Sequence, residues 1–314
     1  MRTRWRSDIS ENDVTPESVF LTRRRLIGAG LGGIAAGLLG GAARAEEAIA
    51  RPLGAAANPA FAPADALTAE AAAGSYNNFT EFGSGKTIQA ASRKLKTSPW
   101  RIRVDGACER PFELDLDDLL KKVELEERIY RHRCVETWSM VVPWTGFPLA
   151  RLVEMAGPTA EAKYLRVESF MDPKVAAGQG SPAYPWPYVE GLELAEARND
   201  LAFLAVGIYG KAMPTQHGAP LRLVLPWKYG FKSAKSLVRF SFVAKRPVSF
   251  WEELQPDEYG FFANVNPKVA HVRWSQANER RLGTNERLPT RLYNGYEAEV
   301  AGLYKGREKE RIWY

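Results

Sequence analysis

Residues 131–140, with the sequence RHRCVETWSM, contain Cys134, one of the two cysteines in this chain of 314 residues. Basic residues precede Cys134, and an apolar, aromatic run follows it. Nearby positive charge lowers the pKa of a thiol, and the thiolate is the form that attacks electrophiles or binds metals. Composition alone gives a structural cysteine, either buried in the core or in a disulfide with Cys108, the same weight as a ligand or nucleophile, because free cysteine is among the most buried residue types.

The first 45 residues have the pattern of an export signal. Three consecutive arginines at 23–25 precede an uncharged, glycine-rich segment at 26–43, and residues 43–45 form a small-x-small cleavage site. This pattern favours the twin-arginine route, with cleavage near Ala45, over the general route or a retained membrane span. The run 28–33 fits G-x-G-x-x-G, but no strand precedes it, so it predicts no dinucleotide site. We therefore expect a periplasmic protein that is exported folded, with a cofactor already loaded.

The charge balance argues against a nucleic-acid partner. The chain has 43 Lys+Arg against 37 Asp+Glu, and its net charge of +6 falls by three units when residues 1–45 are removed. A chain so nearly balanced has no general attraction for phosphate backbones. Two cysteines in an exported chain of this length do not form a disulfide scaffold.

The chain divides into three expected parts: a twin-arginine signal peptide at 1–45, a flexible linker or arm at 46–74, and one catalytic domain at 75–314. The second part is rich in Ala and Pro. Short strands and short helices, separated by long loops rich in Pro and Gly, predict an α+β fold for the third. Alternating apolar residues predict the strands at 100–104, 164–168, 221–225 and 237–243, and helical signals fall at 115–123 and 148–155. The last seventy residues read as coil wrapped on a surface.

Few side chains can bind a metal without help. The three histidines, His132, His217 and His271, form no H-x-x-x-H pair, and there is no C-x-x-C, so a zinc site is not expected. A Cys–His nucleophilic pair is disfavoured, because His132 would share a strand face with Cys134 and be a poor base by geometry. A lone thiolate can bind a soft transition metal if a cofactor supplies the other ligands.

Several long runs of the sequence resemble the sulfite oxidase superfamily of molybdenum enzymes. Residues 133–149 resemble the molybdenum-ligand segment, and the similarity continues, in the same order, at 76–83, 188–192, 226–233 and 257–267. Within the superfamily these runs are most similar to the periplasmic methionine-sulfoxide reductases. The resemblance covers most of the chain from residue 75 to the C-terminus, and the twin-arginine leader as well.

The resemblance implies a sulfite oxidase-type molybdopterin-binding fold, with mixed sheets, short helices and long loops. It implies one molybdenum-molybdopterin cofactor, in the monomolybdopterin form, with Cys134 as the one protein ligand to the metal. It places the contacts to the pterin and its phosphate on Asn77, Thr80, Glu81, Ser169, His217, Arg222, Ser233, Ala234 and Lys235.

These implied contacts are chemically reasonable. Arg222 and Lys235 can neutralise a phosphate, and the amides of residues 233–235 can form an anion-binding concavity. Arg222 taken alone also fits a strand residue that extends its charge to solvent. His217 and Ser169 depart from the close relatives, which have Asn and Thr there, but both keep the ability to form hydrogen bonds.

Three further residues match family positions near the metal: Tyr259, Glu136 and Asn78. A sulfoxide oxygen is a strong acceptor, so a donor near the metal is needed. Tyr259 also fits an ordinary loop tyrosine. Glu136 follows Cys134 by two residues, so a regular strand would point both side chains the same way. Burial beside an anionic centre would raise the Glu136 pKa and make it a neutral proton donor.

The implied activity is the reduction of methionine sulfoxide in oxidised periplasmic proteins, which repairs an oxidative lesion. The sequence has no haem-binding C-x-x-C-H, and the resemblance implies a membrane haem b subunit as the electron donor. One alternative is a sulfite-oxidising or other S- or N-oxide enzyme of the same fold, although a sulfite oxidase would usually have a further domain. Another is a non-enzymatic binding protein in which Cys134 is structural. Metal analysis of the mature protein separates these hypotheses.

Overall fold

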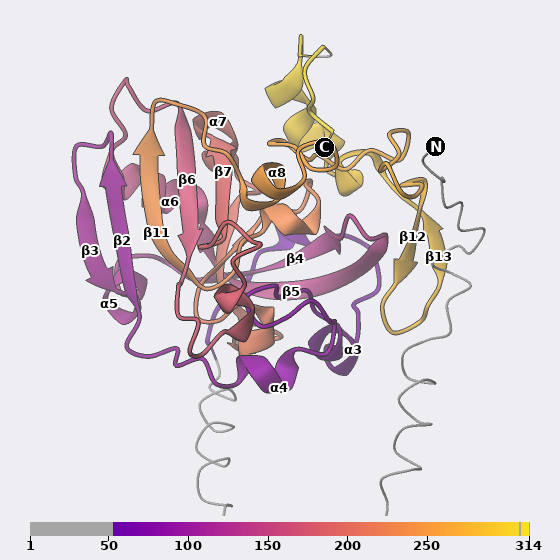
Figure 1. Cartoon of the computed structure of the whole chain (residues 1–314), viewed down its shortest axis with the longest axis horizontal. Coiled ribbons are helices and arrows are strands. Elements are labelled where there is room, and N and C mark those ends of the chain that lie inside the picture. The colour runs from indigo at the N-terminus through magenta and orange to yellow at the C-terminus, as the bar shows by residue number, and fades with distance from the viewer. Residues whose placement is uncertain (1–52, 308, 314) are drawn as a thin grey trace, which may run out of the picture. The chain divides into compact units, whose positions relative to one another are not determined.

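The computed structural model describes residues 53–307 and 309–313 (Figure 1). The predicted signal peptide and the first part of the predicted arm lie outside the described residues. Across the described ranges, no helix is long and apolar enough to cross a membrane.

One sheet has eight strands and contains the central β4–β5 hairpin. Its main path is β1-β4-β5-β12-β13, and β8 joins it by pairing with β5, β9 and β10. The strands are β1 (Ala56–Ala57), β4 (Glu126–Arg133), β5 (Trp138–Pro148), β8 (Phe203–Ile208), β9 (Lys211–Ala212), β10 (Arg222–Val224), β12 (Asn278–Arg281) and β13 (Arg287–Pro289).

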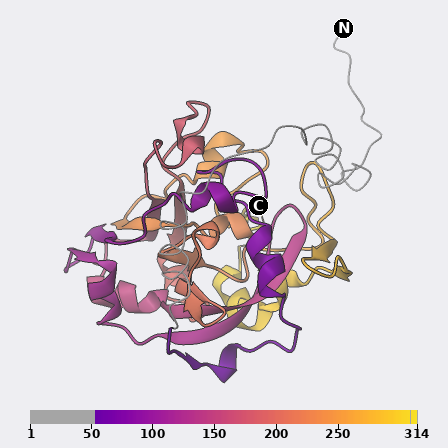
Figure 2. The same cartoon turned by 90° about the horizontal axis from the view of Figure 1, so that it is seen from below.

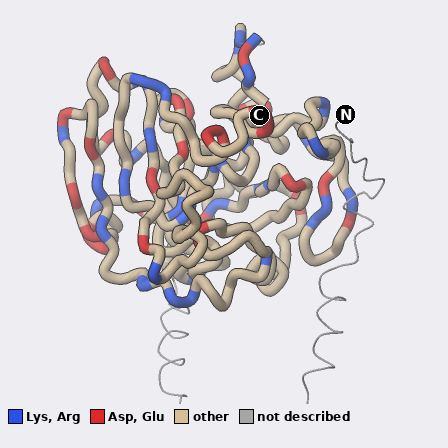
Figure 3. Tube along the Cα trace, in the orientation of Figure 1, with Lys and Arg blue, Asp and Glu red and all other residues tan. Residues whose placement is uncertain are grey.

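The second sheet has five strands in the order β3-β2-β11-β6-β7, and all its pairs are antiparallel except β2 with β11. Its strands are β2 (Arg101–Gly106), β3 (Phe112–Asp115), β6 (Tyr164–Ser169), β7 (Val189–Glu193) and β11 (Leu237–Val243). Figure 1 shows β4 and β5 running across the direction of these strands. Charges of both signs alternate along this sheet (Figure 3), where Asp105, for example, pairs with Arg103 and Arg239.

The helices are short and peripheral to the sheets. The α-helices are α3 (Glu70–Ser75), α4 (Gln89–Ser92), α5 (Leu116–Leu120), α6 (Leu149–Ala156), α7 (Leu194–Ala197), α8 (Phe250–Leu254) and α9 (Glu297–Val300). The 3₁₀ turns are η1 (Pro59–Phe61), η2 (Ala177–Gly180), η3 (Thr215–His217), η4 (Gly230–Lys232), η5 (Leu292–Gly295) and η6 (Ala301–Tyr304). The sequence of helix α6 explains its position and its end: its buried residues recur on one face, and it ends at Gly157, whose φ of 63° favours glycine. The predicted α+β class is therefore confirmed.

The two strands nearest the site are buried on both faces. Every residue of β5 from Trp138 to Phe147 is buried, and so is every residue of β8. A strand covered on both sides reads as a continuous apolar run, so it lacks the alternation that predicted β2, β6, β10 and β11. The C-terminal segment lies beside these long strands (Figure 2), where β12 pairs with β5 and Tyr296 accepts a hydrogen bond from the Arg131 amide.

The described part of the predicted arm, residues 53–74, contacts the rest of the domain at several points. Strand β1 pairs in parallel with β4. The Phe61 ring contacts Tyr130 at 5.9 Å, and the Arg128 guanidinium lies 3.8 Å from its centroid. Asp65 pairs with Arg131, and with Arg281 and Arg291 at 3.3 Å each. These partners lie far along the chain, so local composition gave no sign of them.

The first prediction concerns Gly146, where β5 passes β8 at a register shift. A Cβ on this residue would overlap the Leu204 carbonyl oxygen and lie 2.8 Å from the Ala205 Cα. Both obstacles are backbone atoms that cannot rotate away. We expect Gly146→Ala to lower the free energy of unfolding by about 3 kcal/mol, measured by urea denaturation. Gly54→Ala, with no atom within 4 Å of its Cβ, is the matched control; equal losses in the two variants would contradict the packing argument.

Candidate functional site

Cys134 lies in the tight turn that joins β4 to β5. Its amide donates to the Trp138 carbonyl at 2.9 Å, and its own carbonyl accepts from the Thr137 amide at 3.0 Å. Thr137 takes a left-handed φ of 69° to close the turn. The strand geometry expected for residues 134–136 is therefore wrong, yet the turn still brings the Cys134 sulfur within 3.7 Å of a Glu136 carboxylate oxygen.

The backbone of this turn is held by side chains from elsewhere in the chain. The fully buried Arg133 side chain donates to the Cys134 carbonyl, to Glu279 at 3.2 Å and to the Gln276 side chain at 2.8 Å. The Val135 carbonyl accepts bonds of 2.8 Å from both Trp274 and Gln276. Arg133 thus binds backbone and carboxylate groups, and its charge is not directed at the thiol.

The Cys134 thiol is buried, with 6% of the residue exposed. Burial, with a smaller contribution from the Glu136 charge, raises the pKa of Cys134 to about 12. The lowered pKa expected from the neighbouring basic residues is therefore wrong for the protein alone. Such a thiol is a poor nucleophile at neutral pH. A metal ion at the sulfur would remove the proton outright, so this environment suits a metal ligand better than a nucleophile.

Glu136 is bound by two residues from a preceding loop. Its carboxylate forms an ion pair with Lys86 and accepts a bond of 2.9 Å from the Asn78 amide. Burial alone would raise the Glu136 pKa, but the Lys86 charge and these hydrogen bonds hold it below its ordinary value. The raised pKa expected for Glu136 is therefore wrong, and the group is an anion at neutral pH. Lys86 was not predicted, because its partner lies far along the sequence and no local motif marks it.

Tyr259 is packed in an aromatic setting with its hydroxyl uncommitted. Its ring lies 5.1 Å from Phe231, 5.2 Å from Trp251 and 5.7 Å from His271, between ring centroids. Among the described residues its hydroxyl has no hydrogen-bond partner. Burial, with smaller contributions that include Cys134 and Glu136, raises the pKa of Tyr259 to about 12. The hydroxyl therefore keeps its proton at neutral pH and is free to donate it.

Arg222 is a buried cation that no carboxylate neutralises within the part of the chain that the structure describes. Its guanidinium donates to the carbonyls of His217 at 2.8 Å and Ser233 at 3.3 Å, and lies 4.7 Å from the centroid of the Trp144 ring. Burial lowers the Arg222 pKa to about 9. The reading of a residue that extends its charge to solvent is therefore wrong. A buried cation without a counterion is costly, so this position calls for an anion.

Unsatisfied groups collect around Arg222. The Asn77 side-chain oxygen and His217 Nδ1 are buried without a partner in the described structure. Burial, followed by the charges of Arg222 and Lys235, lowers the His217 pKa to about 3, so its ring is neutral. The backbone amides of Ala234 and Lys235 have no acceptor among the described residues, whereas the Ser233 amide donates to the Gly230 carbonyl at 3.1 Å. Two of the three predicted loop amides are therefore available to an anion.

Glu81 and Ser169 close the same region. The Ser169 hydroxyl lies 2.8 Å from Glu81 Oε1 and is also bonded to the Lys235 carbonyl. Burial raises the Glu81 pKa to about 7, and the hydrogen bond donated by Ser169 and the charge of Lys235 act against this rise. The half-buried Thr80 precedes Glu81, and its carbonyl lies where a side chain on Gly178 would be.

The structure brings the predicted residues together in two adjoining groups. Asn78, Glu136 and Tyr259 surround Cys134, while the others form what we call the anion cradle: Asn77, Thr80, Glu81, Ser169, His217, Arg222, Ser233, Ala234 and Lys235. Asn78 joins the groups, because its side chain binds Glu136 and its carbonyl accepts from Lys235. His132 was missed as a neighbour; it is buried against Trp138, and its Nε2 would lie 2.6 Å from a Cβ on Gly230, which explains the glycine there.

Cys134 is the one cysteine near these groups. Cys108 is half-buried, pairs in an isolated bridge with Pro158, and forms no disulfide with Cys134. Within residues 53–307 and 309–313, no three His, Cys, Asp or Glu side chains are placed to hold a metal. A metal bound by Cys134 would therefore need its remaining ligands from a cofactor.

Comparison with known proteins identifies the class. Residues 89–251, slightly more than half of the chain, match the family model described as the oxidoreductase molybdopterin binding domain. The chain therefore belongs to this molybdopterin-binding family. It is 48% identical over 322 residues to the protein-methionine-sulfoxide reductase catalytic subunit MsrP of Pseudomonas syringae pv. tomato, with 96% of each chain covered. The expected family is thereby confirmed.

Among solved structures, the chain is similar to the sulfane dehydrogenase SoxCD of Paracoccus pantotrophus. The identity is 18% and the TM-score is 0.47. The match covers 76% of this chain and 62% of that one, so this chain spans less than two thirds of its length.

The residues present fit a molybdopterin. The cofactor is anionic through its phosphate and has many polar edges. As far as the described residues show, the anion cradle offers a buried cation without a carboxylate, free backbone amides, and unpaired atoms on Asn77 and His217. Cys134 lies nearby, and its thiolate would be a soft ligand for the transition metal of the cofactor.

The second prediction concerns Glu81 and the pH dependence of stability. Because burial raises the folded pKa of Glu81 from 4.5 to about 7, the folded state binds more protons than the unfolded state in that range. Stability is therefore lost as the pH rises through it. We expect the free energy of unfolding of the wild type to fall by on the order of 2 kcal/mol across this pH range because of Glu81, and Glu81→Gln to lack this fall. Urea unfolding at a series of pH values measures it. Parallel curves for the variant and the wild type would show that Glu81 does not titrate in this way.

Proposed function

We propose that this protein reduces methionine sulfoxide residues in periplasmic proteins to methionine, with a molybdenum-molybdopterin cofactor held by the anion cradle and by Cys134. The observation that carries the proposal is a buried thiol, itself a poor nucleophile, beside buried cations and donors that lack partners. This chain is 48% identical to a catalytic subunit named for this reaction, which supports the choice of substrate.

Each residue near Cys134 has a proposed task in this reaction. The bound cofactor supplies the redox chemistry by which the sulfoxide takes up an electron pair and protons and leaves as thioether and water. Cys134 binds the metal. Tyr259 donates a hydrogen bond, and then a proton, to the sulfoxide oxygen, since its hydroxyl keeps its proton and has no other partner among the described residues. The rings of Phe231 and Trp251 fix the orientation of Tyr259.

Glu136 has a different task from the expected one. As an anion paired with Lys86, it is a proton acceptor and positions Asn78, whose amide it binds. The identity of 48% to a catalytic subunit named for methionine-sulfoxide reduction favours that reaction over the sulfite-oxidising alternative.

The export route and partner complete the proposal. The leader at 1–45 supports export by the twin-arginine machinery and cleavage near Ala45, followed by an arm at 46–74 and the molybdopterin-binding catalytic domain at 75–314. Its relative is named as a catalytic subunit, which supports a second subunit. We assign electron supply to a membrane haem b subunit, as the family resemblance implies.

The third prediction separates the two cysteines. Cys134→Ser removes the soft ligand, so we expect the purified mature protein to lose both its molybdenum and its methionine-sulfoxide reductase activity. Cys108→Ala, at a half-buried position with no role in the site, keeps both. The measurements are metal analysis and steady-state reduction of free and protein-bound methionine sulfoxide, with sulfite oxidation as a control. Wild-type activity in Cys134→Ser would refute the assignment of the ligand.

The fourth prediction concerns proton donation. We expect Tyr259→Phe to lower kcat about 100-fold, since general acid catalysis is typically worth at least that much. Its molybdenum content should stay at the wild-type value, because the ring and its packing are kept. Tyr164→Phe is the matched control and should keep wild-type kcat. Tyr164 lies on β6 of the five-stranded sheet, and its ring packs against Phe261. An unchanged kcat in Tyr259→Phe would exclude the hydroxyl as donor.

A further inference from the structure

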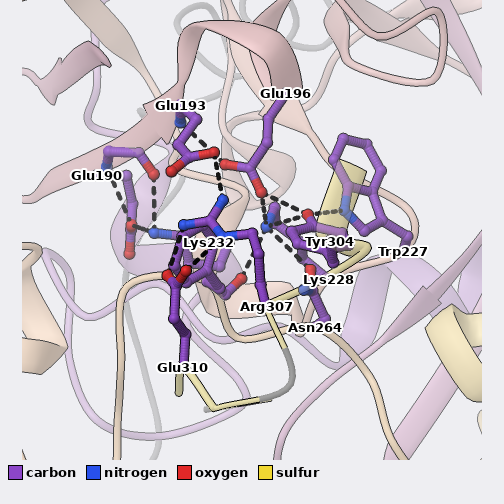
Figure 4. Close-up of polar contacts among 12 residues, drawn as sticks. Glu190, Glu193, Glu196, Trp227, Lys228, Lys232, Asn264, Tyr304, Arg307 and Glu310 are labelled. Carbon is purple, nitrogen blue, oxygen red and sulfur yellow. Dashed lines mark hydrogen bonds and ion pairs between the residues drawn. The ribbon is translucent and has the colours of Figure 1, made fainter. Parts of the chain in front are cut away.

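The loop at 225–236 contains two fully buried lysines, Lys228 and Lys232, each paired with a buried glutamate. The loop follows β10, which carries Arg222, and leads into β11. Both glutamates come from one other segment: Glu190 lies on β7 and Glu196 on α7. The two ion pairs therefore tie the loop to the edge of the five-stranded sheet, and Figure 4 shows both of them.

Lys228 lies at the centre of a buried hydrogen-bonded network (Figure 4). Its ammonium group lies 2.5 Å from Glu196, 2.9 Å from the Phe262 carbonyl, and 3.0 Å from each of the Asn264 and Tyr304 side-chain oxygens. Tyr304 in turn accepts from the indole of Trp227 at 2.9 Å. This network binds the start of the loop to the C-terminal segment.

Lys232 holds the other end of the loop. Its ammonium group pairs with the Glu190 carboxylate and donates to the Gly191 carbonyl at 3.0 Å. Both side chains of the pair are fully buried. Lys232 directly precedes Ser233, whose carbonyl accepts from Arg222 and whose hydroxyl accepts from the Leu225 amide at 3.1 Å. The two free amides of the anion cradle, on Ala234 and Lys235, follow at once.

A buried ion pair contributes little net stability, because well-packed apolar side chains of similar volume are often at least as stabilising. Such a pair does, however, fix one register, since a shifted loop would leave both charges unpaired. The Lys232–Glu190 pair sits next to the amides that face the cofactor phosphate, and neither residue belongs to the cradle. This placement suggests that the pair positions the loop amides rather than stabilises the fold.

We infer that the Lys232–Glu190 pair is a positioning device that holds the 233–235 amides in the arrangement that retains the molybdopterin phosphate. The inference rests on the proposed cofactor site and adds residues to it that touch no cofactor. Lys228 and Glu196 anchor the opposite end of the same loop. Loss of the pair should therefore weaken retention of the cofactor even where the fold survives.

The test measures how fast the purified holoenzyme loses its cofactor. Wild type and Lys232→Met are incubated below their unfolding temperatures, and released pterin is followed by fluorescence while protein-bound molybdenum is measured by mass spectrometry. We expect release from Lys232→Met to be about tenfold faster, which is the scale typical of residues that orient the ligands of a metal without binding it themselves. Lys232→Met/Glu190→Leu, which leaves no unpaired charge, should recover thermal stability but not cofactor retention.

Arg307→Gln is the matched control. Arg307 joins Glu193, in the same segment, to Glu310 of the C-terminal tail at 2.7 Å and 2.6 Å (Figure 4). Within the described structure it forms no hydrogen bond or ion pair with the loop. It should release cofactor at the wild-type rate. A wild-type release rate in the double variant, or in Lys232→Met, would overturn the positioning role and leave the pair merely structural. A wild-type protein without molybdenum would instead refute the proposed function.

Discussion

The antiparallel pairing of β4 with β5 is the constraint on which the rest of the structure depends. Its register sets Arg133 opposite Ser139, so the five residues from Cys134 to Trp138 must close the turn. The strands on either side are buried, and the arm, β8 and the C-terminal segment all pack on them. Cys134 is therefore held at a rigid point between the core and the anion cradle. A ligand that must hold one geometry through a redox cycle benefits from such a place.

The electrostatics of the site are incomplete in the polypeptide alone. Arg222 is buried without a carboxylate partner among the described residues, and the Cys134 pKa of about 12 means that the thiolate needs a cation beside it. These two demands are opposite in sign, and a cofactor that carries both a phosphate and a metal meets both. Folding and cofactor loading should then favour each other.

Much of the fold and of the site could be predicted from the sequence, and the failures have physical causes. Period-two patterns located β2, β6 and β11, because each has one more exposed face, and they also located β10, although its three residues are all buried. The doubly buried β5 and β8 gave no such pattern. The family resemblance collected the cradle residues correctly into one region. The charge states around Cys134 were wrong, because they depend on burial and on Lys86, a partner that only the folded chain brings near.

The central claim is that Cys134 is the protein ligand to molybdenum, and X-ray absorption at the molybdenum edge tests it most directly. Wild-type holoenzyme and Cys108→Ala should show the same number of sulfur neighbours around the metal. If Cys134→Ser, expressed with excess molybdenum, retains any metal, its sulfur count should be lower by the one thiolate. The same sulfur count in Cys134→Ser as in wild type would contradict the account.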